Sequence, residues 1–251
     1  VLSLLNTKSK KREELWEALV GHGHIEHLEI HNPTFFVRRL FGPVSNGLTM
    51  SALVLSGRGK RIDLYLVDFI RHLQMLERME LRRFILRPMD WSRIMFNKSR
   101  LRQLRIGSAC LFDEGTRGPG PAEGGLEATR ERRFLDCQIV LRVVELELSD
   151  NMMSLAIQKA ILAASPDVRR LDICHTKRAD GVKVAALVQE YCAGISSLVL
   201  RSSRQPWAIA ILQTMPVSVV DLALYTGQLD GEMAAVISSR KATLTRLQMD
   251  F

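Results

Sequence analysis

The sequence is poor in aromatic residues and contains no long uninterrupted apolar run. Phe, Trp and Tyr make up 6% of its 251 residues, and they form no run of the kind that stacks nucleic-acid bases. No apolar segment approaches the ~18 residues needed to cross a bilayer, and the first thirty residues carry charges instead of the apolar core of a secretion signal. We therefore expect a cytoplasmic or nuclear protein that does not enter a membrane.

Cysteines are also few and widely spaced. Cys110, Cys137, Cys174 and Cys192 are separated by 27, 37 and 18 positions, so they form neither a CxxC metal pair nor a dense disulfide framework. We expect buried, reduced thiols.

Histidines gather near the N-terminus, between His22 and His31. His27 and His31 would share one face of a strand, but at ~3.3 Å per residue they stand ~13 Å apart, too far for one ion. Loop and surface histidines are the favoured interpretation, and no metal site is expected.

Catalytic and cofactor motifs are missing. The segment Gly57-Arg58-Gly59-Lys60-Arg61 has a superficial likeness to a phosphate-binding loop, yet Arg61 stands where Ser or Thr is required. We interpret it as a basic loop after a strand. No nucleophile elbow or acid/base signature accompanies it. The sequence therefore predicts no catalytic residues, no cofactor and no enzymatic activity.

Apolar and charged residues are both plentiful. Hydrophobic residues make up 47% of the chain and charged residues 25%, which is typical of a globular protein with a large core. The net charge is +8, and residues 1–112 alone hold 19 Lys and Arg against 10 Asp and Glu. Lys8, Lys10, Lys11 and Arg12 form either a nucleic-acid or nuclear-import patch or a solvated turn. A basic N-terminal half favours acidic partners.

An apolar triplet, large-x-x-large-x-large, recurs along the chain. Its nine central residues are Leu28, Leu53, Met79, Leu104, Leu146, Leu171, Leu198, Leu222 and Leu247. Their successive spacings are 25, 26, 25, 42, 25, 27, 24 and 25 residues. The triplet Val1/Leu4 is a possible tenth copy. The long step contains a Gly- and Pro-rich stretch, and we expect a flexible insertion at 113–132.

Between the triplets the apolar period changes from two residues to 3.6, as a strand followed by a helix requires. Val67, Ile70 and Leu73 form one such helical stripe, and Val184 and Val188 belong to another. Each stripe can face a sheet.

These spacings resemble the leucine-rich-repeat family, with its LxxLxLxxN/CxL consensus. The resemblance implies an α/β solenoid, or horseshoe, with a parallel β-sheet on the concave side and helices on the convex side. It covers 1–251 as a single domain of about nine to ten repeats, which we expect to be a fragment of a longer chain. The consensus Asn or Cys is matched cleanly only by Asn151.

Such degenerate repeats look similar to the divergent arrays of fungal-type F-box proteins, although the chain contains no F-box segment. That likeness implies a substrate-recognition role in a ubiquitin ligase.

Side chains alternate across a strand, so the residues between the inward apolar ones predict the concave, partner-facing surface. The candidate partner-binding residues are Arg78, Glu80, Arg82, Arg105, Arg201 and Tyr225. Asp172 and Val199 are also predicted to be outward and exposed, so their truncation should cost less than about 1 kcal/mol.

Two functions compete at this point. The leading hypothesis is a non-catalytic scaffold that binds a protein partner, such as an acidic segment, on the concave face. The alternative is nucleic-acid binding by the basic N-terminal half, which the acidic residues on the same face, such as Glu29 and Glu80, disfavour.

Overall fold

The computed structural model describes residues 2–4, 14, 21, 23–31, 48–86, 88–107, 111–112, 139–149, 153, 155–175, 180–202 and 204–250. These residues belong to two compact units, 1–141 and 142–251, each of which is described by itself. The predicted insertion at 113–132 and the basic segment from Lys8 to Arg12 lie outside the described residues.

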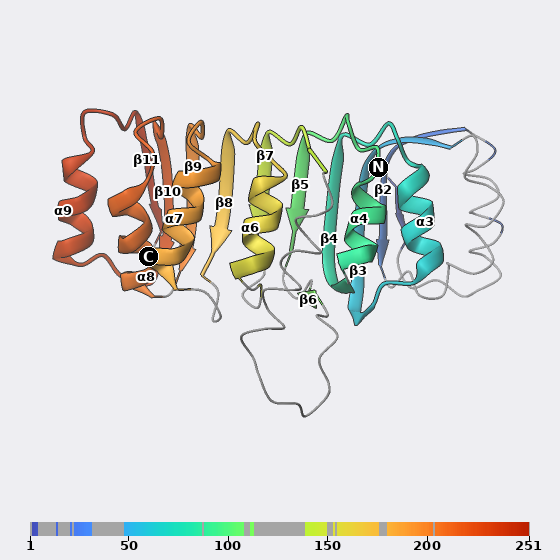
Figure 1. Ribbon diagram of the computed structural model, residues 1–251, viewed down its shortest axis with the longest axis horizontal. Coiled ribbons are helices and arrows are strands. Elements are labelled where there is room, and N and C mark those ends of the chain that lie inside the picture. The colour runs from blue at the N-terminus through green and yellow to red at the C-terminus, as the bar shows by residue number, and fades with distance from the viewer. Residues whose placement is uncertain are drawn as a thin grey trace, which may run out of the picture. The chain divides into compact units, whose positions relative to one another are not determined.

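The first unit is a parallel sheet built in chain order. Its strands are β1 (Leu2–Leu4), β2 (His24–His31), β3 (Thr49–Arg61), β4 (Arg78–Leu86) and β5 (Gln103–Ile106), and β6 (Leu111–Phe112) pairs with the end of β4. Helices α3 (Leu64–His72) and α4 (Pro88–Met95) lie on one side of these strands (Figure 1).

The second unit repeats the same plan. Its strands are β7 (Glu145–Leu148), β8 (Arg170–Cys174), β9 (Ser197–Ser202), β10 (Asp221–Thr226) and β11 (Arg246–Asp250), all parallel and in chain order. The helices are α6 (Leu155–Ala163), α7 (Gly181–Tyr191), α8 (Gln205–Thr214) and α9 (Gly231–Ser239), which again lie on one side of the strands (Figure 1). In the part of the chain that is described, no helix is long and apolar enough to span a bilayer.

The strand register follows the apolar triplets. Leu28 lies beside Leu53, and Leu53 beside Met79. In the second unit Leu171 lies beside Leu198, and the alignment continues through Leu222 and Leu247. The central residues are buried, with one exception at the last strand, where Leu247 is 43% exposed. The predicted repeat register is therefore confirmed.

The helical stripes are confirmed as well. Val67, Ile70 and Leu73 are buried against the first sheet, and Val184 and Val188 are buried in the second unit. Asp63 and Asp180 cap the N-termini of α3 and α7 by accepting hydrogen bonds from the backbone two residues later. These caps fix where each helix begins after its strand.

Side-chain hydrogen bonds attach three strands, near their first residues, to the preceding repeat. Ser51 donates to the Glu26 carbonyl at 2.6 Å, Ser218 to the Ala193 carbonyl at 2.8 Å, and Thr245 to the Val220 carbonyl at 3.1 Å. Hydroxyl groups thus satisfy backbone carbonyls of the preceding repeat near the start of β3, β10 and β11.

The predicted basic loop at Gly57–Arg61 is wrong, because these residues extend β3. The pairing with β4 shifts between Ser56 and Lys60 and then resumes, as in a β-bulge. A Cβ atom on Gly57 would lie 2.6 Å from the Arg83 carbonyl oxygen, and Gly59 has φ of +72°. The two glycines therefore serve a close backbone approach and a bulge, and not a loop.

Candidate interaction surface

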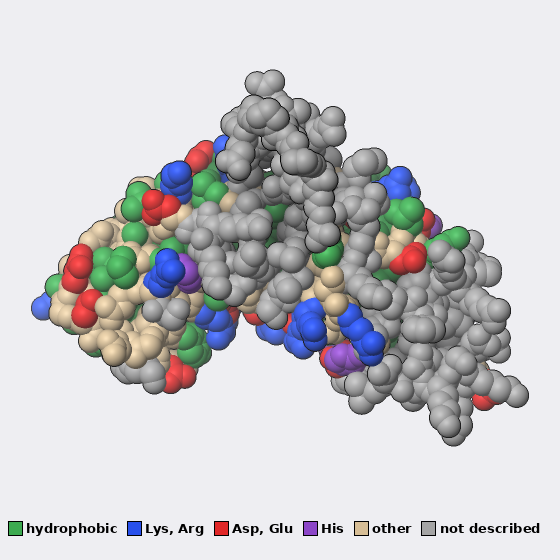
Figure 2. Space-filling model, turned by 90° about the horizontal axis from the view of Figure 1, so that it is seen from below, with side chains coloured by type: hydrophobic (Ala, Val, Ile, Leu, Met, Phe, Trp, Pro, Cys, Tyr) green, Lys and Arg blue, Asp and Glu red, His purple; other side chains and the backbone are tan. Residues whose placement is uncertain are grey.

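The sheet face opposite the helices is called the open face here, and each unit has its own. In the first unit this face carries alternate residues of four strands. They are His27, Glu29 and His31 on β2, Ala52, Val54 and Ser56 on β3, Arg78, Glu80 and Arg82 on β4, and Gln103 and Arg105 on β5. On the side of the molecule that Figure 2 shows, the described residues include both basic and acidic side chains.

A shallow hollow of about 130 Å³ lies in the open face of the first unit. Ala52 and Val54 are short, so they leave space between the longer side chains of the neighbouring strands. Its rim includes His27, Arg78 and Arg105. The register aligns Ala52 with Arg78 and aligns Glu80 with Arg105, so the two arginines come from adjacent strands. The hollow has an apolar floor and a polar, mostly basic rim.

Ion pairs neutralise part of the charge on this face. Arg82 donates from Nε to the Glu80 carboxylate, and His31 Nε2 lies 3.0 Å from Glu29. Glu80 is therefore engaged by Arg82 at the edge of the hollow. With Arg78 and Arg105 against Glu80, the charges that line the hollow sum to a net positive value.

In the second unit Arg201 and Tyr225 lie together, on adjacent strands of the open face. The Arg201 guanidinium carbon stands 4.5 Å from the centroid of the Tyr225 ring, within the range of a cation–π contact. The same guanidinium donates to Asp172 on β8, with Nη2 to Oδ2 at 2.9 Å. Gln248 donates to the Tyr225 hydroxyl at 3.3 Å. The hydrogen bonds to Asp172 raise the pKa of Arg201 above its usual value.

The prediction that Asp172 and Val199 are exposed is wrong. They do lie at open-face positions, but Asp172 is 6% exposed and Val199 is 4% exposed. Asp172 is short and is bound by the long Arg201 side chain of the next repeat, while Val199 lies between Asp172 and Ala223. Large neighbours can shield small side chains even on the uncovered face of a sheet.

At the other end of the same strands, Asp221 on β10 pairs with Arg246 on β11. Hydrogen bonding from Arg246 lowers the pKa of Asp221 below its usual value, and the pair is solvated. Exposed pairs of this kind contribute little to stability, and they shape the charge of the surface instead.

The six predicted partner-binding residues therefore occur in two clusters. Arg78, Glu80, Arg82 and Arg105 are on the first unit, while Arg201 and Tyr225 are on the second. The sequence did not lead us to predict that Asp172 binds Arg201. A signal for this pairing was present, because Asp172 is an acidic residue one repeat before Arg201. Among the described residues, no group of three His, Cys, Asp or Glu is placed to hold a metal ion.

Comparison with known proteins identifies the fold. No protein-family model matches the sequence, and no curated protein matches it. Among solved structures, the leucine-rich repeat-containing protein LegL7 from Legionella pneumophila superposes with a TM-score of 0.57 over 99% of this chain and 82% of that protein, at 15% identity. The likeness supports leucine-rich repeats in general, and it does not support the F-box-type arrays in particular. The chain thus has the fold of an α/β leucine-rich-repeat solenoid.

Proposed function

We propose that the chain is a non-catalytic scaffold that binds an acidic protein segment on the open face of its first unit. One observation carries the proposal, namely the hollow with Ala52 at its base and Arg78 and Arg105 on its rim. An arginine fork can hold a carboxylate through two parallel hydrogen bonds. The hollow beside it is large enough for a small apolar side chain of the same segment.

The burial and register of the strands support this use of the surface. Repeat proteins present rows of side chains from successive strands, which lie ~4.8 Å apart, so an extended segment can cross several strands. The inward residues Leu53, Met79 and Leu104 are buried and hold the strands in place. The outward side chains can therefore be changed without removing the core.

Nucleic acid fits the same face less well. A phosphate backbone favours several basic groups without intervening acids, whereas Glu29 and Glu80 lie among the basic residues here. The described open-face positions of this unit carry no Phe, Trp or Tyr on which bases could stack.

Substrate recognition within a ubiquitin ligase is a narrower form of the same proposal. In that role the repeats would hold the substrate, and another component would recruit the ligase. Copurification of ligase subunits with the protein, together with a bound substrate that charge reversal at Arg78 and Arg105 releases, is the observation that would support it.

The scaffold proposal is tested by charge reversal at the hollow. The variant carries Arg78→Glu and Arg105→Glu, and the matched control carries Arg93→Glu and Arg100→Glu, which are exposed positions outside the hollow. The probes are synthetic peptides in which Ala or Val is flanked by Glu, the same peptides with Gln in place of Glu, and single- and double-stranded oligonucleotides. Circular dichroism checks that each variant is folded.

We expect saturable binding of the Glu-flanked peptides that the first variant weakens by roughly tenfold or more, the loss typical of removing charged hydrogen bonds. The control should bind as the unmodified chain does. Equal binding by both variants would remove the hollow from the proposal. Tight oligonucleotide binding that falls steeply with salt would favour the nucleic-acid alternative.

A further inference from the structure

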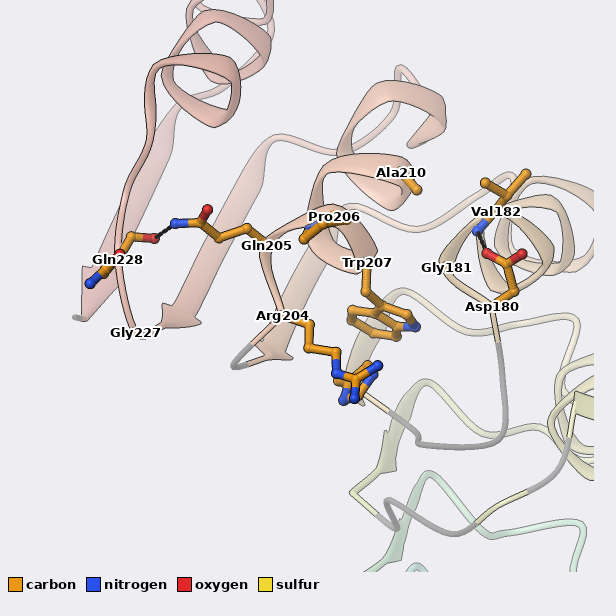
Figure 3. Close-up of a pocket in the computed structure, with 11 residues that line it drawn as sticks. Asp180, Gly181, Val182, Arg204, Gln205, Pro206, Trp207, Ala210, Gly227 and Gln228 are labelled. Atoms are coloured by element: carbon orange, nitrogen blue, oxygen red, sulfur yellow. Dashed lines mark hydrogen bonds between the residues drawn. The ribbon is translucent and has the colours of Figure 1, made fainter.

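A larger pocket, of about 770 Å³, lies in the second unit and is separate from the open-face hollow. It forms where strands β8, β9 and β10 end and helices α7 and α8 begin (Figure 3). Its lining includes His175, Arg204, Trp207 and Asp180. None of these was singled out by the repeat pattern, since His175, Asp180 and Arg204 lie between a strand and a helix and Trp207 lies in the first turn of α8.

Trp207 supplies the first observation that points to a ligand. It is 5% exposed, and its indole Nε1 has no hydrogen-bond partner in the structure. Figure 3 shows this nitrogen on the edge of the ring that faces the start of α7, whose residues Asp180, Gly181 and Val182 also line the pocket. A buried donor without an acceptor costs free energy, so an acceptor held at this position would be bound favourably.

The N-terminus of α8 supplies the second observation. The N-cap residue is Arg204, whose guanidinium has no acceptor with which to cap the helix, and Pro206 follows in the first turn. Helix α7 differs, because Asp180 caps it by accepting from the Val182 amide at 3.0 Å. The first turn of α8, which carries Trp207, thus has an uncapped, positively polarised end within the lining of the pocket.

The side chains around these groups add further donors. Arg204 is exposed and extends along the pocket, and His175 meets Trp207 edge to face, with ring centroids 5.6 Å apart. The Asp180 carboxylate is the acidic group of the lining, and it is engaged at the start of α7. The Gln205 side chain points away from Trp207 and donates to the Gln228 carbonyl at 3.1 Å (Figure 3).

From these groups we infer that the pocket at the start of α8 binds a compact oxyanion, a phosphate or a carboxylate. Trp207 Nε1 and the Arg204 guanidinium are the side-chain donors, and the helix end adds favourable polarity. An anion at a helix N-terminus is a stable arrangement when neighbouring side chains also donate.

Gly181 makes this pocket possible. A Cβ atom at Gly181 would stand 2.8 Å from the Cα atom of Trp207, so only glycine lets α7 approach α8 this closely. The approach buries the indole of Trp207 against the start of α7.

The test uses the whole chain, labelled with nitrogen-15, and follows the indole N–H resonance of Trp207 by NMR. Inorganic phosphate, acetate and chloride are titrated at constant ionic strength. Trp207→Phe assigns the resonance and removes the donor, while Trp91→Phe, another buried tryptophan outside the pocket, is its control. Arg204→Gln is compared with Lys183→Gln, which removes one positive charge from an exposed position on α7 outside the lining.

We expect a saturable shift of the Trp207 resonance with phosphate or acetate and none with chloride. The anion that saturates it identifies the source of the oxyanion. Arg204→Gln should weaken the binding by roughly tenfold or more, whereas Lys183→Gln should leave it unchanged. Because Arg204 is exposed, this pair stays interpretable even if Trp207→Phe fails to fold. Shifts that never saturate, or that are equal in Arg204→Gln and Lys183→Gln, would overturn the inference.

Discussion

Asp172 and Arg201 are joined across adjacent strands by paired hydrogen bonds, Nε to Oδ1 at 3.0 Å and Nη2 to Oδ2 at 2.9 Å. Their backbones are offset in register, since Asp172 aligns with Val199 and Cys174 aligns with Arg201. The arginine therefore reaches back along its strand to bind a carboxylate that is itself nearly inaccessible to water. This geometry links two repeats through side chains.

We expect Asp172→Ala to destabilise the chain by about 1 to 3 kcal/mol, because it removes a charge-assisted hydrogen-bond pair from a shielded position. Chemical denaturation measures the change. Asp167→Ala, at an exposed turn position, is the control and should stay within about 0.5 kcal/mol. A double-mutant cycle with Arg201→Ala isolates the pair, and a coupling energy near zero would show that the two residues act independently.

The inward positions should be far more sensitive than the exposed ones. Leu171 and Leu198 are fully buried and lie side by side, so truncating either to Ala should cost about 2 to 5 kcal/mol through lost burial and a residual cavity. Arg170, exposed on the same strand as Leu171, is the control, and Arg170→Ala should stay within about 0.5 kcal/mol. Comparable losses at all three positions would contradict the strand register.

Lys98 should make the stability of the chain depend on pH in the alkaline range. It is buried, its Nζ donates to the Arg71 carbonyl at 3.1 Å, and burial, assisted by the nearby Arg71 charge, lowers its pKa from 10.5 to about 8. Between these two values the unfolded chain binds the proton more strongly than the folded chain does. The contribution of Lys98 to stability therefore rises as the pH increases from about 8 to 10.5.

Lys98→Met removes this titration, so denaturation of both proteins at pH 7 and pH 10 measures it. Relative to the variant, the unmodified chain should gain roughly 2 kcal/mol over this range. A constant difference between the two proteins would show that the folded-state pKa of Lys98 is not lowered.

Cys192 should resist alkylation at neutral pH. It is buried after α7 with a free thiol, and burial raises its pKa to about 12, so the reactive thiolate is scarce. Cys174 is partly exposed on the open face and is the internal comparison. Mass spectrometry after iodoacetamide treatment should find Cys174 modified well before Cys192. Equal modification of the two thiols under native conditions would mean that the region around the end of α7 unfolds locally and exposes Cys192.

The repeat register was predictable because inward positions recur at nearly constant spacing and burial tolerates few alternatives there. Leu53, Leu171 and Leu198 each lie where the triplet places them. The shielding of Asp172 was not predictable in the same way, because it depends on how the Arg201 side chain folds over a neighbouring strand. Alternation gives the face that a residue occupies, and it does not give its exposure.

The pocket at α8 escaped sequence reasoning for a related reason. Its residues come from connecting segments and from the first turns of α7 and α8, where the apolar period constrains few side chains. A signal was nevertheless present, since Gly181 begins α7 and Trp207 lies in the first turn of α8. Glycine has no side chain, and tryptophan has the largest one. Such complementary sizes in adjacent repeats indicate a close helix approach. Gly57 was misread because glycine and basic residues suggest a loop, while the structure uses them in a bulged strand.

The alignment of Asp172 with Val199 bears on how the number of repeats can change during evolution. Loss of residues 172–198 would join Leu171 directly to Val199, and the fused strand would keep Leu171 and Leu200 inward with Arg201 outward. Because each repeat contacts mainly its neighbours, a gene for such a chain can shed or duplicate a whole module while the remaining modules still stack in phase. The length of the array is thereby open to variation by recombination, at a structural cost confined to the new junction.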